Sequence, residues 1–307
     1  MRTDEINIRD PYILLCEGRY YLYGTRSATC WGAADGFDCY ISNDLKEWEG
    51  PVEIFRRQEG FFADRCYWAP ECVCRNGEEN DEGSSFYLVT TFAGENEKKG
   101  IYVLHAKSPA GPFELYSERL TPADWACIDG TVYFEENADT GDKIPYLIFS
   151  HSFEDTPDGD MCAMKLSKDL KRAEGEPIVL FSAAEAPWAR PVPFAKAEFG
   201  MDGDVYFTDG PCVVKGADGK LRMTWSSWGT RGYAVGVAVS ESGLLKGPWR
   251  QLGETLYAEN GGHGMMFYDK EGQMKFTLHF PNDKYKEHPV FLDVRTKGDG
   301  YESTEME

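Results

Sequence analysis

The sequence predicts an all-β protein, a five-bladed β-propeller with four-stranded antiparallel blades, and three observations support this fold class. Helical periodicity is nearly absent, and short β-branched or aromatic runs alternate with Gly, Asp and Asn turns instead. One plan repeats five times: a polar residue opens an apolar run, a turn follows, and an aromatic or aliphatic strand returns. The openings stand 61, 58, 80 and 54 residues apart, which leaves room for one four-stranded blade in each interval.

The first two strands of each repeat form a predicted hairpin. The pairs are 10–15 with 20–23, 71–74 with 86–89, 129–134 with 146–149, 209–214 with 221–225, and 263–267 with 274–278. Each pair is joined across a turn containing Gly or polar residues, as expected for antiparallel neighbours.

Third strands follow at the same place in each unit. They are 39–41, 101–104, 161–166, 233–239 and 290–292. Several lead into a shared exit signal built from Ser-x-Asp-Leu or Gly-Pro, after which a fourth strand is expected, for example 178–181. The prediction is one propeller domain over 1–295 and a polar C-terminal tail over 296–307. The fifth blade then lacks an obvious outer strand, and closure of the ring through the N-terminal segment stays open.

Charge and hydropathy exclude several classes of function. The 307 residues hold 52 Asp and Glu against 32 Lys and Arg, a net charge of −20, which repels nucleic acid and anionic membrane surfaces. No run of 18 apolar residues is present, so no membrane-spanning helix is expected. Residues 1–10 (MRTDEINIRD) contain no apolar core of a signal peptide, which predicts a cytoplasmic protein unless a leader has been removed. The oligomeric state is not readable.

The opening residues of the five repeats are polar: Asp10, Glu71, Asp129, Asp209 and His263. The first strand of a propeller blade lines the central channel, so these side chains are expected to meet in one cavity. Each residue alone also fits a turn former or an exposed charge. Together they point to a functional site, because crowded carboxylates raise one another's pKa and cost stability. Two carboxyl groups flanking a bond are what glycoside hydrolysis requires.

Five short phrases around these residues resemble, in order and spacing, the blade-opening motifs of glycoside hydrolase family 43. They are Arg9-Asp10-Pro11-Tyr12-Ile13, Tyr67-Trp68-Ala69-Pro70-Glu71, Ile128-Asp129-Gly130, Asp209-Gly210-Pro211 and Gly262-His263-Gly264, and the resemblance spans about residues 8 to 295.

The resemblance implies an inverting mechanism with three catalytic carboxyl groups. Asp10 matches the general base, Asp129 the residue that orients the acid and tunes its pKa, and Asp209 the general acid. Glu71 matches a motif near the sugar. His263 matches a channel histidine that helps to hold a structural calcium ion, while the chemistry itself needs no cofactor.

One position departs from the family pattern, because the acid is usually Glu in a Glu-Gly-Pro phrase and this chain has Asp209. The missing methylene shortens the reach by roughly 1.3 Å, which matters where proton donation depends on geometry. Either the backbone of the fourth blade lies closer to the substrate, or the acid comes from elsewhere, or the activity is reduced. The first alternative is favoured.

Aromatic and polar residues near strand ends are candidates for substrate binding. Besides Glu71 they are Trp68, Trp228, Arg26, His151 and Arg231. The tryptophans would stack on a sugar ring and the others would bind hydroxyl groups, although each tryptophan also fits a place in the core.

The predicted function is an exo-acting, inverting glycoside hydrolase that removes α-L-arabinofuranosyl or β-D-xylosyl units from plant-derived oligosaccharides. One alternative is a glycoside phosphorylase on the same fold, which would need a basic phosphate pocket where the channel phrases supply only Arg9. The other is a non-catalytic carbohydrate-binding propeller, indicated by the departure at Asp209. The sugar, the linkage and the choice between exo and endo cleavage stay open.

Overall fold

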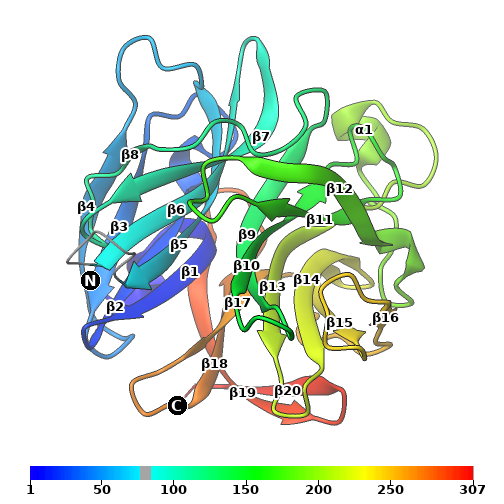
Figure 1. Ribbon diagram of the computed structural model, residues 1–307. Helices are drawn as coiled ribbons and strands as arrows, with labels where there is room; N and C mark the ends of the chain where they lie inside the picture. Colours follow the sequence, from blue (N-terminus) through cyan, green and yellow to red (C-terminus); the bar gives the residue numbers. More distant parts are fainter. Residues whose placement is uncertain (77–83, 307) are drawn as a thin grey trace.

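The computed structural model describes residues 1–76 and 84–306, and it consists of five four-stranded antiparallel sheets arranged around a central channel (Figure 1). The five-bladed propeller predicted from the repeats is therefore confirmed. Each blade takes four strands in chain order, joined by successive hairpins.

The strands have the following bounds. Blade 1 holds β1 (Ile8–Cys16), β2 (Arg19–Arg26), β3 (Gly36–Ser42) and β4 (Trp48–Arg56); blade 2 holds β5 (Arg65–Asn76), β6 (Ser84–Gly94), β7 (Glu97–Ala106) and β8 (Glu114–Leu115). Blade 3 holds β9 (Cys127–Glu136), β10 (Lys143–His151), β11 (Asp160–Leu166) and β12 (Ala173–Ser182). Blade 4 holds β13 (Asp209–Lys215), β14 (Leu221–Gly229), β15 (Gly232–Ser240) and β16 (Trp249–Gln251); blade 5 holds β17 (Gly262–Tyr268), β18 (Met274–Phe280), β19 (His288–Lys297) and β20 (Gly300–Glu305).

The first strands β1, β5, β9, β13 and β17 lie around the centre of the molecule (Figure 1) and contact one another around the ring. Between neighbouring blades lies an apolar cluster, because each sheet buries both faces against its neighbours. Phe37 of blade 1, for example, packs with Phe92 of blade 2, and Phe181 of blade 3 packs with Trp225 of blade 4. Each such buried side chain contributes about 1.5–3 kcal/mol.

The C-terminal segment differs from the prediction. Residues Gly300–Glu305 form β20, which pairs antiparallel with β19 and is the outer strand of blade 5. The boundary of the propeller at residue 295 is therefore corrected, since the expected tail contains a strand. Its sequence is polar because an outer strand at the rim of a blade is largely solvated.

The ring of blades closes between blades 1 and 5 through contacts between apolar side chains. Ile8 and Leu22 of blade 1 pack with Phe267 and Phe291 of blade 5 in one apolar cluster. The described part of blade 5 takes all four of its strands from 262–305, so the ring needs no strand from the N-terminal segment.

A long connection between blades 3 and 4 accounts for the interval of 80 residues between two openings. It contains the 3₁₀ helix η3 (Ala183–Glu185) and the short helix α1 (Ala195–Phe199); two further 3₁₀ helices, η1 (Thr3–Glu5) and η2 (Ser27–Thr29), lie near the N-terminus. Val192 and Val205 of the connection pack against Phe153 and Trp228, which are at the edge of the channel. Within residues 1–76 and 84–306 no helix has the length and apolar character needed to cross a membrane.

Candidate active site

The first strand of every blade contains a residue with a left-handed backbone at a break in strand pairing, and β5 contains a second one, Cys66 (φ 55°). Taken one from each blade, these residues are Asp10 (φ 54°), Ala69 (47°), Asp129 (58°), Gly210 (50°) and His263 (45°), and each lies at a shift in strand register. Such a bulge turns the local side chain toward the end of the channel. The structurally equivalent positions are therefore Ala69 in blade 2 and Gly210 in blade 4, where the sequence pattern had placed Glu71 and Asp209.

The backbone N–H of four of these residues is bound by a side chain from the second strand of the preceding blade. The contacts are Ala69 N to Thr25 Oγ1 (2.8 Å), Asp129 N to Thr91 Oγ1 (3.1 Å), His263 N to Ser226 Oγ (2.9 Å) and Asp10 N to His279 Nδ1 (3.2 Å). Because a buried amide without a partner is costly, these contacts compensate for the interrupted strand pairing. The channel end is thus held by the same kind of contact at four of its five blade junctions.

The fifth junction, between blades 3 and 4, departs from this pattern. The N–H of Gly210 donates to Asp129 Oδ2 at 3.3 Å, and the buried Ser150 Oγ, at the matching position of blade 3, has no hydrogen-bond partner within the described residues. Glycine is required here because a Cβ would lie 2.6 Å from the ring of His263, in addition to the left-handed φ. The packing of His263 therefore explains the glycine in the Asp-Gly-Pro phrase of blade 4.

A cavity of about 560 Å³ opens at this end of the channel. Asp10, Asp129, Asp209 and His263 line it together, so the structure brings four of the five predicted opening residues to one pocket. Its wall is strongly aromatic. The aromatic lining residues are Trp31, Trp68, Phe153, Phe194, Phe199, Phe207, Trp228 and Tyr233. A polar floor with aromatic walls suits a sugar ring, which presents both hydroxyl groups and apolar C–H faces.

Asp10 lies in surroundings that favour its charge. Thr25 Oγ1 donates a hydrogen bond to Asp10 Oδ2 at 2.6 Å, and His263 Nδ1 lies 3.2 Å from Asp10 Oδ1. Burial alone would raise the pKa of Asp10, but the neighbouring His263 and Arg9 side chains stabilise the ionised form more strongly, so its pKa lies below the ordinary value. Asp10 is therefore a carboxylate at neutral pH.

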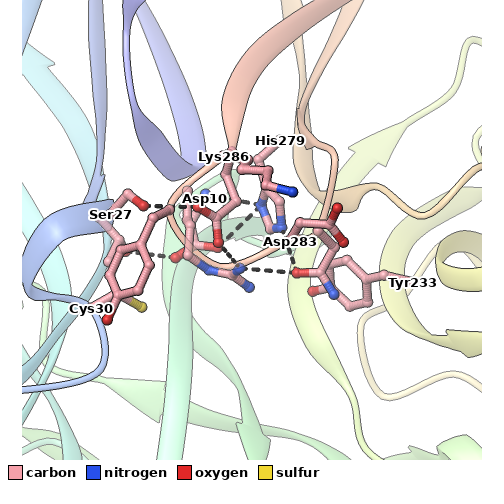
Figure 2. A network of polar contacts seen from close by, with 12 residues as sticks. Asp10, Ser27, Cys30, Tyr233, His279, Asp283 and Lys286 are labelled. Atoms are coloured by element: carbon pink, nitrogen blue, oxygen red, sulfur yellow. Dashed lines mark hydrogen bonds and ion pairs between the residues drawn. The ribbon is translucent and has the colours of Figure 1, made fainter.

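A network of polar contacts surrounds Asp10, and His279 of blade 5 takes part in it (Figure 2). The Arg9 guanidinium donates to Asn282 Oδ1 at 2.9 Å and to Glu287 Oε1 at 2.8 Å. Glu287 is fully buried and also accepts a hydrogen bond from Ser27 Oγ at 2.8 Å. Glu287 thus neutralises the guanidinium, and Asn282 helps to fix its position beside the pocket.

His279 belongs to the same network as a neutral imidazole. Burial, reinforced by the charge of Arg9, lowers the pKa of His279 well below its ordinary value. Its Nδ1 accepts the N–H of Asp10, so Nε2 carries the proton and donates to Asn282 Oδ1 at 3.2 Å. This tautomer orients the backbone of Asp10 and leaves its carboxylate free to contact the pocket.

Asp129 and Asp209, in contrast to Asp10, have pKa values above the ordinary value. Burial, with the charges of Asp209 and Asp10, raises the pKa of Asp129 to about 8, although His263 acts in the other direction with Nδ1 at 3.5 Å. Burial also raises the pKa of Asp209 to about 7, although a hydrogen bond from the Tyr233 hydroxyl at 2.9 Å favours its ionised form. The two carboxyl groups are close enough for each to affect the pKa of the other. They therefore retain a proton near neutral pH, while Asp10 does not.

Glu71 does not line the pocket. It stands two residues beyond the left-handed Ala69 and is buried. Burial raises its pKa to about 8, although the nearby Thr131 hydroxyl acts in the other direction. Glu71 is therefore a neutral, buried acid beneath the pocket, separated from the position expected of a sugar ligand.

The other predicted binding residues divide into two groups. Trp68 and Trp228 line the pocket. Arg26 instead binds the carboxylates of blade 1, with Asp38 at 2.6 Å, and does not reach the pocket. His151 stacks on Trp125 with ring centroids 4.0 Å apart, and Arg231 is 63% exposed on the surface.

Arg231 pairs with Glu259 at that surface. The polar network beside the pocket gave no signal in the sequence. Its members His279, Asn282 and Glu287 contact Asp10 or Arg9 across about 270 residues, and no repeat motif marks them. The aromatic residues of the connection, such as Phe194 and Phe199, did leave a signal, since the long interval between the third and fourth openings marks an insertion.

The calcium ion implied by the resemblance stays a prediction, and the described residues offer few protein ligands for it. His263 Nδ1 faces two carboxylates at 3.2 and 3.5 Å and so acts as an N–H donor. Ca²⁺ takes roughly six to eight oxygen ligands. In the part of the chain that the structure describes, no group of three or more His, Cys, Asp or Glu side chains is placed to hold a metal ion. The chemistry below is therefore derived from the side chains alone.

Comparison with known proteins agrees with this geometry. Residues 5–300 match the family model of glycosyl hydrolases family 43. The endo-arabinase of Bacteroides thetaiotaomicron VPI-5482 is 34% identical, with a TM-score of 0.83 over 97% of this chain and 98% of that one. A search of curated proteins gives no match.

Two further solved structures share the fold at lower identity. The endo-1,4-beta-xylanase of Bacteroides thetaiotaomicron VPI-5482 is 22% identical (TM-score 0.70, covering 99% of this chain and 96% of that one). The alpha-L-arabinofuranosidase of Lactobacillus brevis is 16% identical (TM-score 0.66, covering 99% and 97%). The family match, the fold and the pocket of carboxyl groups together lead to one conclusion: the chain belongs to glycoside hydrolase family 43 and is an inverting glycosidase.

Proposed function

We propose that the enzyme releases α-L-arabinofuranosyl units from the ends of plant-derived oligosaccharides by a single displacement at the anomeric carbon. The observation that carries the mechanism is the opposite protonation of carboxyl groups in one pocket. Asp10 has a lowered pKa, whereas the pKa of Asp209 is raised to about 7. One group can therefore take a proton at the pH where the other can give one.

In the proposed step, Asp10 is the general base and Asp209 the general acid. A water molecule attacks the anomeric carbon and gives a proton to the Asp10 carboxylate, while the bond from that carbon to the leaving oxygen breaks. Asp209 transfers its proton to the leaving oxygen, so the leaving sugar departs as a neutral alcohol. Exchange with solvent then removes the proton from Asp10 and returns one to Asp209.

Asp129 influences the general acid Asp209 and does not itself give a proton to the leaving oxygen. Burial of both carboxyl groups, with the repulsion between their charges, keeps a proton on the pair. Gly210 N and His263 Nδ1 both contact Asp129 Oδ2, which fixes the orientation of this carboxyl group. We therefore assign Asp129 the positioning of Asp209 and the tuning of its pKa.

The similarity to the endo-arabinase, at 34% identity over nearly the whole chain, supports the arabinofuranosyl group as the sugar. The xylanase, at 22% identity, supports only the fold. The β-D-xylosyl alternative is therefore kept as a comparison substrate.

The boundary of the pocket supports cleavage from a chain end. On one side Phe194 and Phe199 of the connection between blades 3 and 4 line the cavity. Lys284 of the loop between β18 and β19 reaches toward Glu198 of α1 across this side, with Nζ 3.9 Å from Oε2. Internal cleavage is the second candidate, because the 34% identical relative is an endo-arabinase.

The charges of the pocket argue against the phosphorylase alternative. Each cation that lines the cavity faces a carboxylate: Arg9 binds Glu287, Lys99 binds Glu154 at 2.8 Å, and Lys284 faces Glu198. A phosphate group would compete with these partners.

The products of hydrolysis test the proposal. Linear α-1,5-linked arabino-oligosaccharides should yield monomeric arabinose from the first time points, and xylo-oligosaccharides should react at least about tenfold more slowly. Longer oligosaccharides as the first products would replace exo by endo cleavage. Phosphate-dependent release of a sugar 1-phosphate would favour the phosphorylase. The Asp10→Asn variant is the blank, and saccharide binding without turnover by the native enzyme would favour the non-catalytic propeller.

A further inference from the structure

We propose that a depression beside the catalytic pocket is a binding subsite for the sugar units that follow the bond being cleaved. The depression has a volume of about 410 Å³ and is lined by Trp31, Asp64 and Arg65, among others. It shares Cys30, Trp31 and Trp68 with the catalytic pocket, so the two cavities meet along one wall. The inference rests on the proposed function, because it assigns the place of the leaving part of the same substrate.

The walls of this depression are held by defined contacts. Ala33 and Arg65 form an antiparallel bridge, which joins the loop before β3 to the start of β5. Trp68 Nε1 donates to Cys30 O at 2.8 Å, and one Arg65 Nη donates to Gly94 O at 2.6 Å. The surface is therefore formed before a ligand binds, which limits the entropy lost on binding.

The lining provides the two kinds of contact that a sugar needs. Trp31 is 47% exposed and lies edge-on to Trp68, with centroids 6.1 Å apart. The Asp64 side chain is 48% exposed and lies at ion-pair distance from Arg65, with Oδ1 3.8 Å from Nε. The exposed part of this carboxylate can accept a hydrogen bond from a sugar hydroxyl group, while the exposed part of the Trp31 indole would contact the C–H groups of the ring.

The depression also lies where the rest of an oligosaccharide would leave the catalytic pocket. It shares Arg65 and Cys66 with a third depression of about 510 Å³, which extends past Asn96 and Lys98. The opposite side of the catalytic pocket is bounded by the connection between blades 3 and 4. A chain whose end lies in the pocket therefore has a continuous path across Trp31 toward Asp64.

The experiment compares short and long substrates in Asp64→Ala and Asp64→Asn. The substrates are 4-nitrophenyl α-L-arabinofuranoside, which ends at the pocket, and α-1,5-arabinotetraose. Both variants should keep kcat/KM on the aryl glycoside within about twofold. On the tetraose, Asp64→Ala should lose about tenfold, the effect of one lost hydrogen bond to a charged group, and Asp64→Asn should lose less because its amide oxygen still accepts a hydrogen bond. Arg231→Ala is the matched control, since Arg231 is exposed and distant from these cavities. It should leave both values unchanged.

Three results would overturn the inference: an unchanged rate on the tetraose, an equal loss on both substrates, or retained affinity for the tetraose when Asp64→Ala is added to the inactive Asp10→Asn variant in calorimetry. Failure of the proposed function gives a different result. In that case the native enzyme leaves arabinotetraose intact and cleaves another series, such as xylotetraose, on which the same comparison of Asp64 variants is then made. If Asp10→Asn binds no tetrasaccharide of either series, both proposals are wrong.

Discussion

Replacing the general acid should make the protein more stable at alkaline pH. The pKa of Asp209 is raised from its ordinary value of 3.8 to about 7 by burial. Between these values the folded protein holds a proton that the unfolded chain has released, so the contribution of Asp209 to stability falls as the pH rises from about 4 to about 7. Above that range the folded state carries the full cost of a buried charge. Asparagine keeps the shape of the side chain and removes this cost.

The size of the effect follows from the same values. The interval is about three pH units, and each corresponds to about 1.4 kcal/mol, which gives about 4 kcal/mol for a fully buried group. With an unfolding entropy of about 2.1 cal/mol/K per residue, the Tm of Asp209→Asn should exceed that of the native protein by about 6 °C at pH 9. At pH 4 the two should be equal within about 1 °C. The native enzyme would thus give up stability to keep a working acid.

Thermal unfolding followed by circular dichroism between pH 4 and pH 9 measures this difference. Asp139→Asn, in an exposed turn of blade 3, is the control and should show no pH-dependent gain. A difference in Tm that stays constant across the pH range would refute the raised pKa of Asp209. So would a variant that is less stable than the native protein at pH 9.

Three further predictions concern the same pocket. Tyr233→Phe removes the hydrogen bond that favours ionised Asp209, so the alkaline limb of kcat/KM should move upward by about one pH unit; a downward shift would contradict the role of Tyr233. Gly210→Ala should lower stability by about 3 kcal/mol in urea unfolding, because its Cβ meets the ring of His263. Gly272→Ala, also at a left-handed position but in open space, should cost clearly less, and equal losses would remove the packing argument. Treatment with EDTA should leave kcat within about twofold, since the proposed steps pass through side chains only, and loss of activity restored by Ca²⁺ would overturn that view.

The strands of the propeller could be predicted because each repeat carries its own apolar alternation. The outer strand Gly300–Glu305 was missed for the converse reason: Tyr301, which packs against the cluster between blades 4 and 5, is its only large apolar residue, and the others are Gly, Ser, Thr and Glu. Nothing in its composition separates it from a solvated tail. Its conformation is decided by pairing with β19 and not by a local preference for strand.

The pocket was predictable only to within one or two residues. The repeat placed Asp10, Asp129 and His263 correctly, since each stands at the left-handed position of its blade. Glu71 lies two residues too far along because the bulge at Ala69 is invisible in the apolar pattern.

Long-range pairing accounts for the remaining differences. Arg26 and His151 follow second strands as the polar pattern indicated, but Arg26 is bound by Asp35 and Asp38 and His151 stacks on Trp125. The carboxylate or ring that such a side chain contacts depends on which strands and loops lie beside it. A single sequence does not show these neighbours.

The assignment of Asp10 as base and Asp209 as acid is tested most directly by varying the leaving group. Asp209→Ala should retain most of its kcat/KM on 2,4-dinitrophenyl α-L-arabinofuranoside, whose phenolate leaves without a proton, and should lose at least about a hundredfold on arabino-oligosaccharides. Asp10→Ala should lose at least about a hundredfold on both, because activation of water is needed in each case. Equal losses of Asp209→Ala on the two substrates, or an active Asp10→Ala, would contradict the account.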